Sequence, residues 1–332
     1  MTGPEVRWGI VGPGNIAASV MPDFGHVPGA TVVAVASRSA ERAQDFAERF
    51  GIARAYGSYA EIIADDEVDV LYIATPHPQH HEVALAAIQA GKALLVEKSF
   101  TATVAGAEEV IAAARERGVF VMEAMWTRFQ PAIVAARRLV DQGAIGEVRQ
   151  LQADLGVDRP YEPTHRLFDP AQGGGAMLDL GVYPVSFAHY FLGEQDTIDV
   201  VGSLTPTGVD WEAGVLLGYP DGRSASILIS LRNPTPGAAR IFGTEGWIEV
   251  PPRFHHPKRI VLHPTGRDSE TIEQPPLGTG YSHELIEVTQ GVQAGRTESA
   301  VMPLDDTLAV QRTLNAACEQ LGVFHGEAVG VV

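Results

Sequence analysis

The segment Val6-Arg7-Trp8-Gly9-Ile10-Val11-Gly12-Pro13-Gly14-Asn15-Ile16-Ala17 decides the fold of this chain. Its first six residues have the pattern of a short buried strand, and the rest has the spacing G-x-G-x-x-A at the start of a helical pattern. Gly12 permits a sharp turn, Gly14 leaves room for a pyrophosphate, and Ala17 lets the helix lie close to the strand. Unpaired amide groups at a helix N-terminus also attract phosphate oxygens. We therefore predict a dinucleotide site made by Gly12, Pro13, Gly14, Asn15 and Ile16. The alternative is a glycine-rich turn that only joins a strand to a helix.

Strands and helices alternate over the first third of the chain. Apolar runs predict strands at 31–36, 69–74, 93–96 and 119–122, and the segments between them predict helices at 40–50, 81–90 and 105–117. Continuous apolar strands that alternate with helices are typical of a parallel sheet covered on both faces. We expect residues 1–123 to form a Rossmann domain.

The pattern changes after residue 123. A helix is expected at 131–141, a long strand at 148–157, and a glycine-rich loop followed by a helix within 173–191. Shorter strands are expected at 198–204, 213–219, 224–231, 239–242, 247–250 and 260–262, and final helices at 281–294 and 304–321. Short Gly, Pro and Asp turns between the strands indicate an antiparallel sheet. The expected fold class is therefore α/β, with residues 124–332 as a second α/β domain and the last helix as a candidate to pack back on the first domain.

Composition excludes several classes of function. The chain has 332 residues, of which 45% are apolar, and its 24 basic and 41 acidic residues give a net charge of −17. This charge argues against nucleic acid or an acidic membrane surface as a partner. No apolar run predicts a membrane span and no signal-peptide pattern is present. The single Cys318 suits a reducing cytosol, where we expect it to be a buried structural thiol.

No metal site is expected from ligand spacing. His255 and His256 are adjacent in a Pro-flanked loop, and no further ligands follow at a suitable distance. We expect this loop to be solvated.

The end of the second strand bears on the choice of cofactor. NAD sites usually carry an acidic residue there, whereas this chain has Ser37, Arg38 and Ser39, with Arg42 one helical turn later. Hydroxyl and guanidinium groups suit a 2′-phosphate, so we predict NADP over NAD. The alternative is that Ser39 only caps the helix and that Arg42 is a solvated surface charge.

Two later strand ends add candidates. Thr75, Pro76, His77 and His80 follow one strand, and either histidine could contact the nicotinamide. Glu97 and Lys98 end the next strand, where a lysine ammonium needs a partner. That partner is Glu97 or a substrate oxygen, and a simple ion pair remains the alternative.

A triple glycine at 173–175 leads into the helix expected up to residue 191. Asp179 and Tyr183 are four residues apart, which would place them on one face of an α-helix. An acid and a phenol on an apolar helix need polar partners. The alternative is a core tyrosine with Asp179 bonded to backbone amides.

Together these motifs resemble the glucose–fructose oxidoreductase/inositol dehydrogenase (Gfo/Idh/MocA) family over nearly the whole chain. The resemblance rests on Gly12-Pro13-Gly14-Asn15-Ile16-Ala17, Glu97-Lys98 and Gly174-Gly175-Ala176-Met177-Leu178-Asp179-Leu180-Gly181-Val182-Tyr183. Residues 55–59, 77–80 and 122–129 further resemble its dihydrodiol dehydrogenase and NADP-dependent D-xylose dehydrogenase branch. The resemblance implies a Rossmann domain, a second domain with a large open-faced antiparallel sheet, a metal-free reaction, and a homodimer or dimer of dimers formed through the open sheet face.

The family implies a role for each matched residue. Lys98 matches the catalytic lysine, Asp179 the acid of the glycine-rich helix, and Tyr183 the tyrosine of this branch, whereas Ser99 stands where most members have proline. The implied reaction is hydride transfer between NADP and a sugar, polyol or diol. Because tyrosine is a weak base near neutrality, we expect the ammonium of Lys98 to favour its phenolate.

Trp126, Arg128 and Arg166 are further candidates for the site, and two other functions remain open. Trp126 and Arg128 follow the last strand of the first domain and are candidates for the cofactor site; Trp126 and Arg166 are candidates for substrate contact, with core packing and a surface role as their alternatives. The other functions are a redox-assisted epimerase or glycoside-cleaving enzyme that retains its cofactor, and a non-catalytic NADP sensor.

Overall fold

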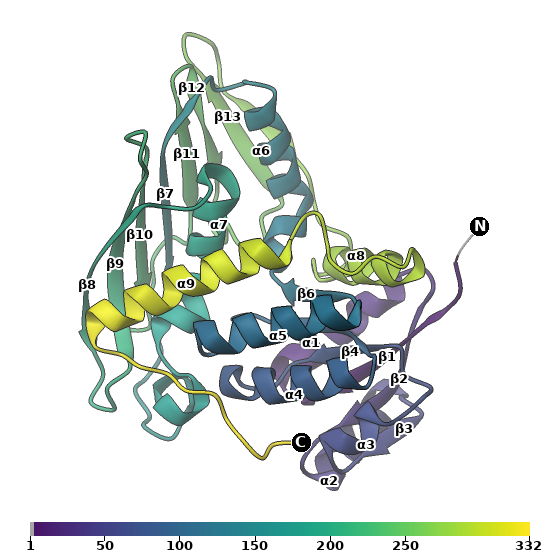
Figure 1. The fold of residues 1–332 in the computed structure, drawn as a ribbon. Coiled ribbons are helices and arrows are strands. Elements are labelled where there is room, and N and C mark those ends of the chain that lie inside the picture. Colours follow the sequence, from purple (N-terminus) through teal and green to yellow (C-terminus); the bar gives the residue numbers. More distant parts are fainter. Residues whose placement is uncertain (1–2) are drawn as a thin grey trace. The chain divides into compact units, whose positions relative to one another are not determined.

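The computed structural model describes residues 3–332, which form two compact units (Figure 1). The first unit contains the chain up to Ala124 together with Leu277–Leu308 and Gly326–Val332. The second contains Met125–Pro276 and Ala309–His325. The sequence division into 1–123 and 124–332 did not include the two later segments in the first unit, because a run of helix or loop does not reveal on which sheet it packs.

The first unit is built on a six-stranded parallel sheet with the order β3-β2-β1-β4-β5-β6. The strands are β1 (Val6–Val11), β2 (Ala30–Ala36), β3 (Arg54–Tyr56), β4 (Val70–Ile73), β5 (Ala93–Glu97) and β6 (Val121–Ala124). The helices of this part are α1 (Asn15–Val20), α2 (Ala40–Phe50), α3 (Tyr59–Ile63), α4 (His77–Gln89) and α5 (Val104–Arg117), with a 3₁₀ turn at Met21–His26. The strand order reverses between β1 and β4, which is the Rossmann switch point where ligands bind. The expected Rossmann fold is confirmed.

Apolar composition explains the central strands. Every residue of β4 and β5 is buried, as predicted by their continuous apolar runs. Strand β3 and helix α3 were not predicted. The strand has only three residues, and the helix has five and begins at a capping box in which Ser58 and Glu61 bond each other's backbone amides.

Helix α8 (Ser282–Gln293) belongs to the first unit and is held there by a buried carboxylate. Asp23 accepts hydrogen bonds from the backbone amides of Thr279, Gly280 and Ser282 at 2.9, 3.1 and 2.8 Å, and from the Thr279 hydroxyl at 2.9 Å. A carboxylate beside helix N-terminal amides satisfies donors that have no partner within the helix. Asp23 thus fixes a segment that is more than 250 residues away in sequence.

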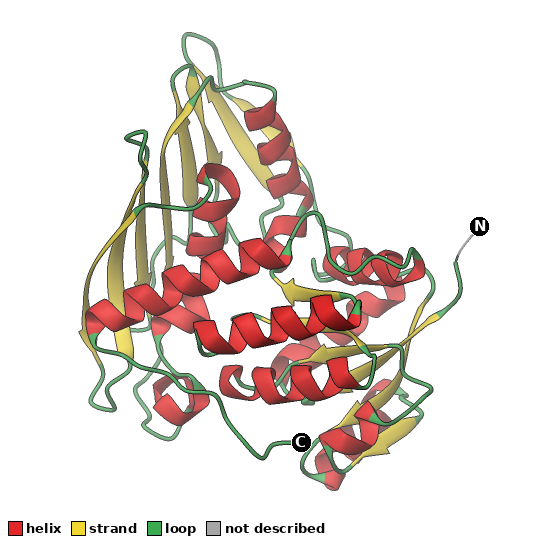
Figure 2. Ribbon diagram, in the orientation of Figure 1, coloured by secondary structure: helices red, strands yellow, loops and turns green. Residues whose placement is uncertain are grey.

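The second unit is built on an eight-stranded sheet with the order β14-β13-β12-β11-β7-β10-β9-β8. Figure 2 shows the strands of the protein as yellow arrows. The strands are β7 (Val148–Gly156), β8 (Thr197–Leu204), β9 (Asp210–Gly218), β10 (Ser224–Ser230), β11 (Ala239–Gly243), β12 (Gly246–Val250), β13 (Arg259–Pro264) and β14 (Glu270–Glu273). All neighbours are antiparallel except β7 and β10, which run parallel. The expected mostly antiparallel sheet is confirmed, although β14 was not predicted.

One face of this sheet is buried and the other is open over β8, β9 and β10. Along β9, Ala213, Val215 and Leu217 are buried, whereas Leu216 is half exposed. This alternation follows from side chains that point to opposite faces of a strand. Helix α6 (Pro131–Asp141) packs on β13, and helix α7 (Val182–Leu192) packs on β7 and β10 (Figure 1).

The segment before α7 differs from the prediction. The helix predicted after the glycine-rich loop is not a single α-helix, because Met177–Gly181 forms a π-helical turn that leads into α7. Extra-wide turns of this kind are rare and occur often at functional sites. Sequence spacing did not predict the turn because the helical hydrogen-bond pattern changes by only one residue.

The last helix, α9 (Leu304–Leu321), contributes residues to both units. Cys318 lies within it and is buried, as expected. Across residues 3–332, none of the helices has the length and apolar character needed to cross a membrane. The compartment of the protein stays a prediction.

Candidate active site

The carboxyl ends of the parallel strands bring most predicted site residues of the first unit to one edge. Gly12 follows β1, Ser37 follows β2 and Thr75 lies two residues after β4. Glu97 ends β5, and Lys98 follows it directly. Parallel strands all end at the same edge, and β5 lies two strand spacings from β1, or about 10 Å. Residues that are 86 positions apart in sequence thus border one region.

The glycine turn has the geometry that a dinucleotide requires. Gly12 has φ +91°, and a Cβ at this residue would lie 3.0 Å from the backbone of Ala74, so a larger residue would not fit. A Cβ at Gly14, by contrast, would meet no described atom within 4 Å. Gly14 is also the N-cap of α1 and provides no side chain to its amides. The open space and the available amides fit a pyrophosphate.

Two arginines lie at the end of β2. The hydroxyl of buried Ser37 accepts from the Ser39 amide at 3.2 Å, and the Ser39 hydroxyl accepts from the Arg42 amide at 3.3 Å. Ser39 therefore caps α2, which was its alternative interpretation. The side chains of Arg38 and Arg42 are exposed. Burial raises the pKa of Tyr59, and the positive charges of these two arginines oppose that rise.

The buried ring of His80 contacts backbone carbonyl oxygens of two loops. Its ring is fully buried, with Nε2 2.8 Å from the Thr75 carbonyl oxygen and Nδ1 3.0 Å from the Ser99 carbonyl oxygen. The ring therefore joins the loop after β4 to the segment after β5, next to Lys98. Both nitrogens face the protein's own carbonyl oxygens, and burial lowers the pKa of the imidazole. His77 is also buried and lies 5.9 Å from His80 between ring centroids.

Acidic groups surround the end of β5. The Tyr72 hydroxyl donates to Glu97, and the other Glu97 carboxylate oxygen accepts from the Lys98 amide at 3.3 Å. Burial and the charge of Glu97 raise the pKa of both Tyr72 and Glu284 well above their ordinary values. The Lys98–Ser99 peptide bond is cis.

In the second unit the π-helical turn positions an ion pair. Asp179, whose side chain is 13% exposed, accepts from Arg166 at 3.0 Å, and the guanidinium of Arg166 is 46% exposed. The sequence leaves Arg166 open between substrate contact and a surface role, and it offers backbone amides as one set of partners for Asp179. The structure brings the two residues together.

An aromatic cluster contains Tyr183 and Trp126. The Tyr183 ring lies 5.0 Å from the His255 ring, and the Trp126 ring stacks on His256 at 5.1 Å. The Thr127 hydroxyl donates to the His255 carbonyl oxygen at 2.8 Å and holds the loop in place. The expectation that this loop is solvated was wrong, because its histidines pack on aromatic rings. Sequence reasoning missed His255, since nothing near it in sequence indicated that it would meet Tyr183.

Arg128 supports helix α7. Its side chain is 1% exposed; Nε donates to the Ser186 hydroxyl at 3.2 Å, and the guanidinium lies 5.0 Å from the Tyr190 ring centroid. A buried guanidinium is stable only when it is well bonded, so these contacts give Arg128 a structural role within the second unit. The cofactor contact expected of it stays a prediction.

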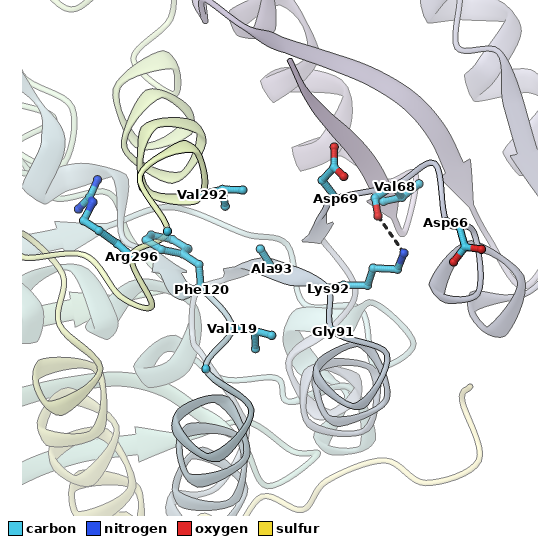
Figure 3. A pocket seen from close by; sticks show the side chains of 12 residues that line it. Asp66, Val68, Asp69, Gly91, Lys92, Ala93, Val119, Phe120, Val292 and Arg296 are labelled. Atoms are coloured by element: carbon cyan, nitrogen blue, oxygen red, sulfur yellow. Dashed lines mark hydrogen bonds between the residues drawn. The ribbon is translucent and has the colours of Figure 1, made fainter. Parts of the chain in front are cut away.

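A separate hollow in the first unit lies at the opposite edge of the parallel sheet (Figure 3). It is lined by residues that precede β4, β5 and β6, among them Asp69, Lys92 and Phe120. The Lys92 ammonium donates to the carbonyl oxygens of Asp65 and Val68 at 2.7 and 2.9 Å. Because ligands of open α/β sheets bind at the carboxyl edge, this hollow is not the cofactor site.

Comparisons with solved structures support the fold. The chain has a TM-score of 0.87 and 27% identity to the aldose-aldose oxidoreductase from Caulobacter crescentus, covering 96% of this chain and 98% of that one. It has a TM-score of 0.84 and 26% identity to KijD10, a 3-ketoreductase from Actinomadura kijaniata solved with NADP, covering 97% and 99%.

Sequence comparisons establish the family. Residues 6–125 match the model described as "Oxidoreductase family, NAD-binding Rossmann fold", and residues 133–249 match that of the GFO/IDH/MocA C-terminal domain. The chain is 39% identical to trans-1,2-dihydrobenzene-1,2-diol dehydrogenase from Mus musculus, over 96% of this chain and 97% of that protein. The Homo sapiens protein of the same name is 37% identical. The chain therefore belongs to the Gfo/Idh/MocA oxidoreductase family and is a dehydrogenase whose Rossmann domain binds NAD(P).

Proposed function

We propose that this chain transfers hydride between NADP and a CH–OH carbon of a trans-diol or a sugar, with Lys98 and Tyr183 handling the proton. The observation that carries the proposal is the position of Lys98, which directly follows β5 at the same sheet edge as the glycine turn. The full-length similarity to proteins named trans-1,2-dihydrobenzene-1,2-diol dehydrogenase favours a trans-diol as the first substrate to test.

The proposed NADP site uses three parts of the carboxyl edge. The backbone amides of the first turn of α1, after Gly14, hold the pyrophosphate, and Arg38 and Arg42 hold the 2′-phosphate through charge-assisted hydrogen bonds. The segment Thr75-Pro76-His77 borders the nicotinamide end. When bound, the nicotinamide supplies the hydride acceptor or donor.

The proton is proposed to move at Tyr183 Oη. A substrate hydroxyl that loses hydride from its carbon must also lose its proton, and an ordinary phenol with a pKa of about 10 is a poor base near neutrality. The ammonium of Lys98 beside the same substrate oxygen would lower the phenol pKa and would stabilise negative charge on that oxygen. The ring contact between His255 and Tyr183 orients the phenol.

Asp179 and Arg166 are proposed to position the substrate. Their ion pair leaves the guanidinium nearly half exposed, so it can bond a second hydroxyl of a diol or sugar. Trp126, which is 8% exposed and stacked on His256, supplies an apolar wall against a carbon ring.

A substrate screen with both cofactors tests the proposal. Absorbance of the reduced nicotinamide is followed for trans-diols and aldoses with NADP and NAD, for the wild-type chain and for Lys98→Met. We expect turnover with a trans-diol or aldose, loss of at least about 100-fold in kcat for Lys98→Met, and NADP affinity unchanged within about tenfold. Most of the activity retained in Lys98→Met would refute the role of the lysine.

The same screen separates the other functions. A cofactor that stays bound and cycles without net reduction would favour a redox-assisted epimerase or glycoside-cleaving enzyme. Tight NADP binding with no reaction on any substrate would favour a sensor.

We further propose that the open face of the second sheet pairs with a second copy of this chain. Val201, Leu216 and Leu228 lie on this face on three adjacent strands and are 81%, 50% and 50% exposed. Neighbouring apolar side chains on an open sheet suit an interface. Light scattering should give a dimer or tetramer for the wild type and a smaller species for Leu216→Asp; a wild-type monomer would refute this assembly.

A further inference from the structure

A second cluster of chemically active side chains lies in the second unit, apart from the residues assigned to the reaction. Asp210 begins β9, Cys318 lies in the last turns of α9, and His325 follows that helix. One ligand atom from each residue lies within 4.8 Å of the other two. All three residues belong to the same compact unit, so their arrangement is part of its fold.

The polar atoms of this cluster are buried without sufficient partners. Asp210 is 0% exposed; its Oδ2 accepts from the Met177 amide at 2.6 Å, but its Oδ1 has no hydrogen-bond partner among the described residues. Neither ring nitrogen of His325 has a hydrogen-bond partner within residues 3–332, and both nitrogens are shielded from solvent. A buried polar atom without a partner costs about 1–3 kcal/mol, so three such atoms in one place require an explanation.

We propose that Asp210, Cys318 and His325 bind a zinc ion or another late first-row divalent cation. Thiolate sulfur, imidazole nitrogen and carboxylate oxygen are together the donors that Zn²⁺ prefers, whereas Mg²⁺ and Ca²⁺ select oxygen donors. Bound through one atom of each residue, a cation would give a partner to Asp210 Oδ1 and to one ring nitrogen of His325.

Charge balance supports a divalent ion. A thiolate and a carboxylate contribute two negative charges and a neutral imidazole contributes none, so a 2+ ion makes the site neutral. A neutral site avoids the desolvation penalty of a buried net charge. On binding, the Cys318 thiol loses its proton to solvent as the sulfur–metal bond forms, and no atom changes oxidation state.

The geometry requires little movement. Bonds of about 2.0–2.3 Å in a tetrahedral zinc site separate the ligand atoms by roughly 3.3–3.8 Å, so a closure of about 1 Å brings atoms within 4.8 Å into place. The fourth position is left for water. We assign the ion a structural role, because the cluster is buried and Asp210 also bonds the Met177 amide at the start of the π-helical turn.

Ligand spacing along the sequence predicts no metal site in this chain. It could not find this one, because Asp210 is more than 100 residues from the other two ligands and Cys318 and His325 are separated by a helix end.

Cobalt titration of the chelator-treated, full-length protein tests the proposal. Co²⁺ bound to a thiolate gives a charge-transfer band in the near ultraviolet, and Cys318 is the only cysteine, so this band reports on one site. We expect the band at one equivalent of Co²⁺, its loss on adding one equivalent of Zn²⁺, and an upward shift of the thermal midpoint with Zn²⁺.

Variants assign the ligands. Cys318→Ser should abolish the band and His325→Ala should abolish or weaken it at least tenfold, whereas the control His26→Gln, at an exposed histidine, should leave it unchanged. Far-UV circular dichroism checks the fold of each variant. Absence of the band in the wild type would overturn the proposal, and so would a band that His325→Ala leaves unchanged.

Discussion

Replacement of Arg38 by alanine should separate the affinities for the two nicotinamide cofactors. Arg38 follows buried Ser37 at the end of β2, and its exposed guanidinium lies near Tyr59 together with that of Arg42. The carboxyl end of the second strand is where Rossmann domains contact the adenosine ribose. If the two arginines bind a 2′-phosphate, loss of one of them should weaken the binding of NADP and leave the binding of NAD nearly unchanged.

The expected magnitude follows from the kind of bond that is lost. A hydrogen bond to a charged group contributes about 1.5–3 kcal/mol, which corresponds to a rise of about 10- to 150-fold in the Kd of NADPH. NADH has no 2′-phosphate, so its Kd should change by less than about threefold. Because Arg38 is exposed, added salt should reduce the difference between the cofactors.

Fluorescence titration of NADPH and NADH measures both constants. Arg49→Ala is the matched control. Arg49 is an exposed arginine in the last turn of α2, the helix that follows Arg38, and its loss changes the net charge by the same amount. The control should bind both cofactors as the wild type does. The role of Arg38 in binding the 2′-phosphate would be refuted if Arg38→Ala raised the Kd of NADPH and of NADH equally. It would also be refuted if Arg49→Ala raised the Kd of NADPH as much as Arg38→Ala does.

Three other substitutions test the surrounding structure. Asp23→Ala removes the acceptor of four hydrogen bonds and should lower the free energy of unfolding by about 4 kcal/mol in urea denaturation, with Asp23→Asn less affected; a loss below about 1 kcal/mol would contradict the role of the carboxylate. Burial raises the pKa of Glu284, so the folded protein keeps a proton that the unfolded chain loses, and wild-type stability must fall as pH rises above the ordinary glutamate pKa. A glutamine does not titrate, so the free energy of unfolding of Glu284→Gln relative to that of the wild type should rise by up to about 1.4 kcal/mol per pH unit above the ordinary glutamate pKa. A difference in unfolding free energy that does not change with pH would contradict the raised pKa of Glu284. Arg166→Ala should lower kcat/KM about tenfold while changing stability by less than about 1 kcal/mol, because the guanidinium is nearly half exposed; unchanged kinetics would remove it from the site.

Local patterns predicted the parallel sheet of the first unit, apart from its three-residue strand β3. The apolar runs of β4 and β5 and the glycine spacing after β1 each depend on neighbouring residues, so the strands, their parallel arrangement and the edge that carries Lys98 followed from sequence. Helix α8 was predicted as a helix, but its place in the first unit depends on bonds to Asp23, which the sequence does not indicate.

The second unit was less predictable where distant residues meet. The ion pair of Arg166 and Asp179, the ring contact of His255 with Tyr183, and the cluster around Asp210 each join segments that are separate in sequence. Sequence spacing identified Asp179 and Tyr183 as candidates because polar residues stand out on an apolar helix. It could not identify the groups that orient them, because those groups are brought near only by the packed sheet and loops.

A double-mutant cycle on kcat/KM tests most directly whether Lys98 and Tyr183 act on one substrate oxygen. Lys98→Met, Tyr183→Phe and the double variant are compared with the wild type on the best substrate of the screen, with saturating NADP. Two residues that act as a unit have non-additive effects, so the double variant should be within about tenfold of the slower single variant. If the two losses multiply, the residues act independently and the proposed pair is wrong.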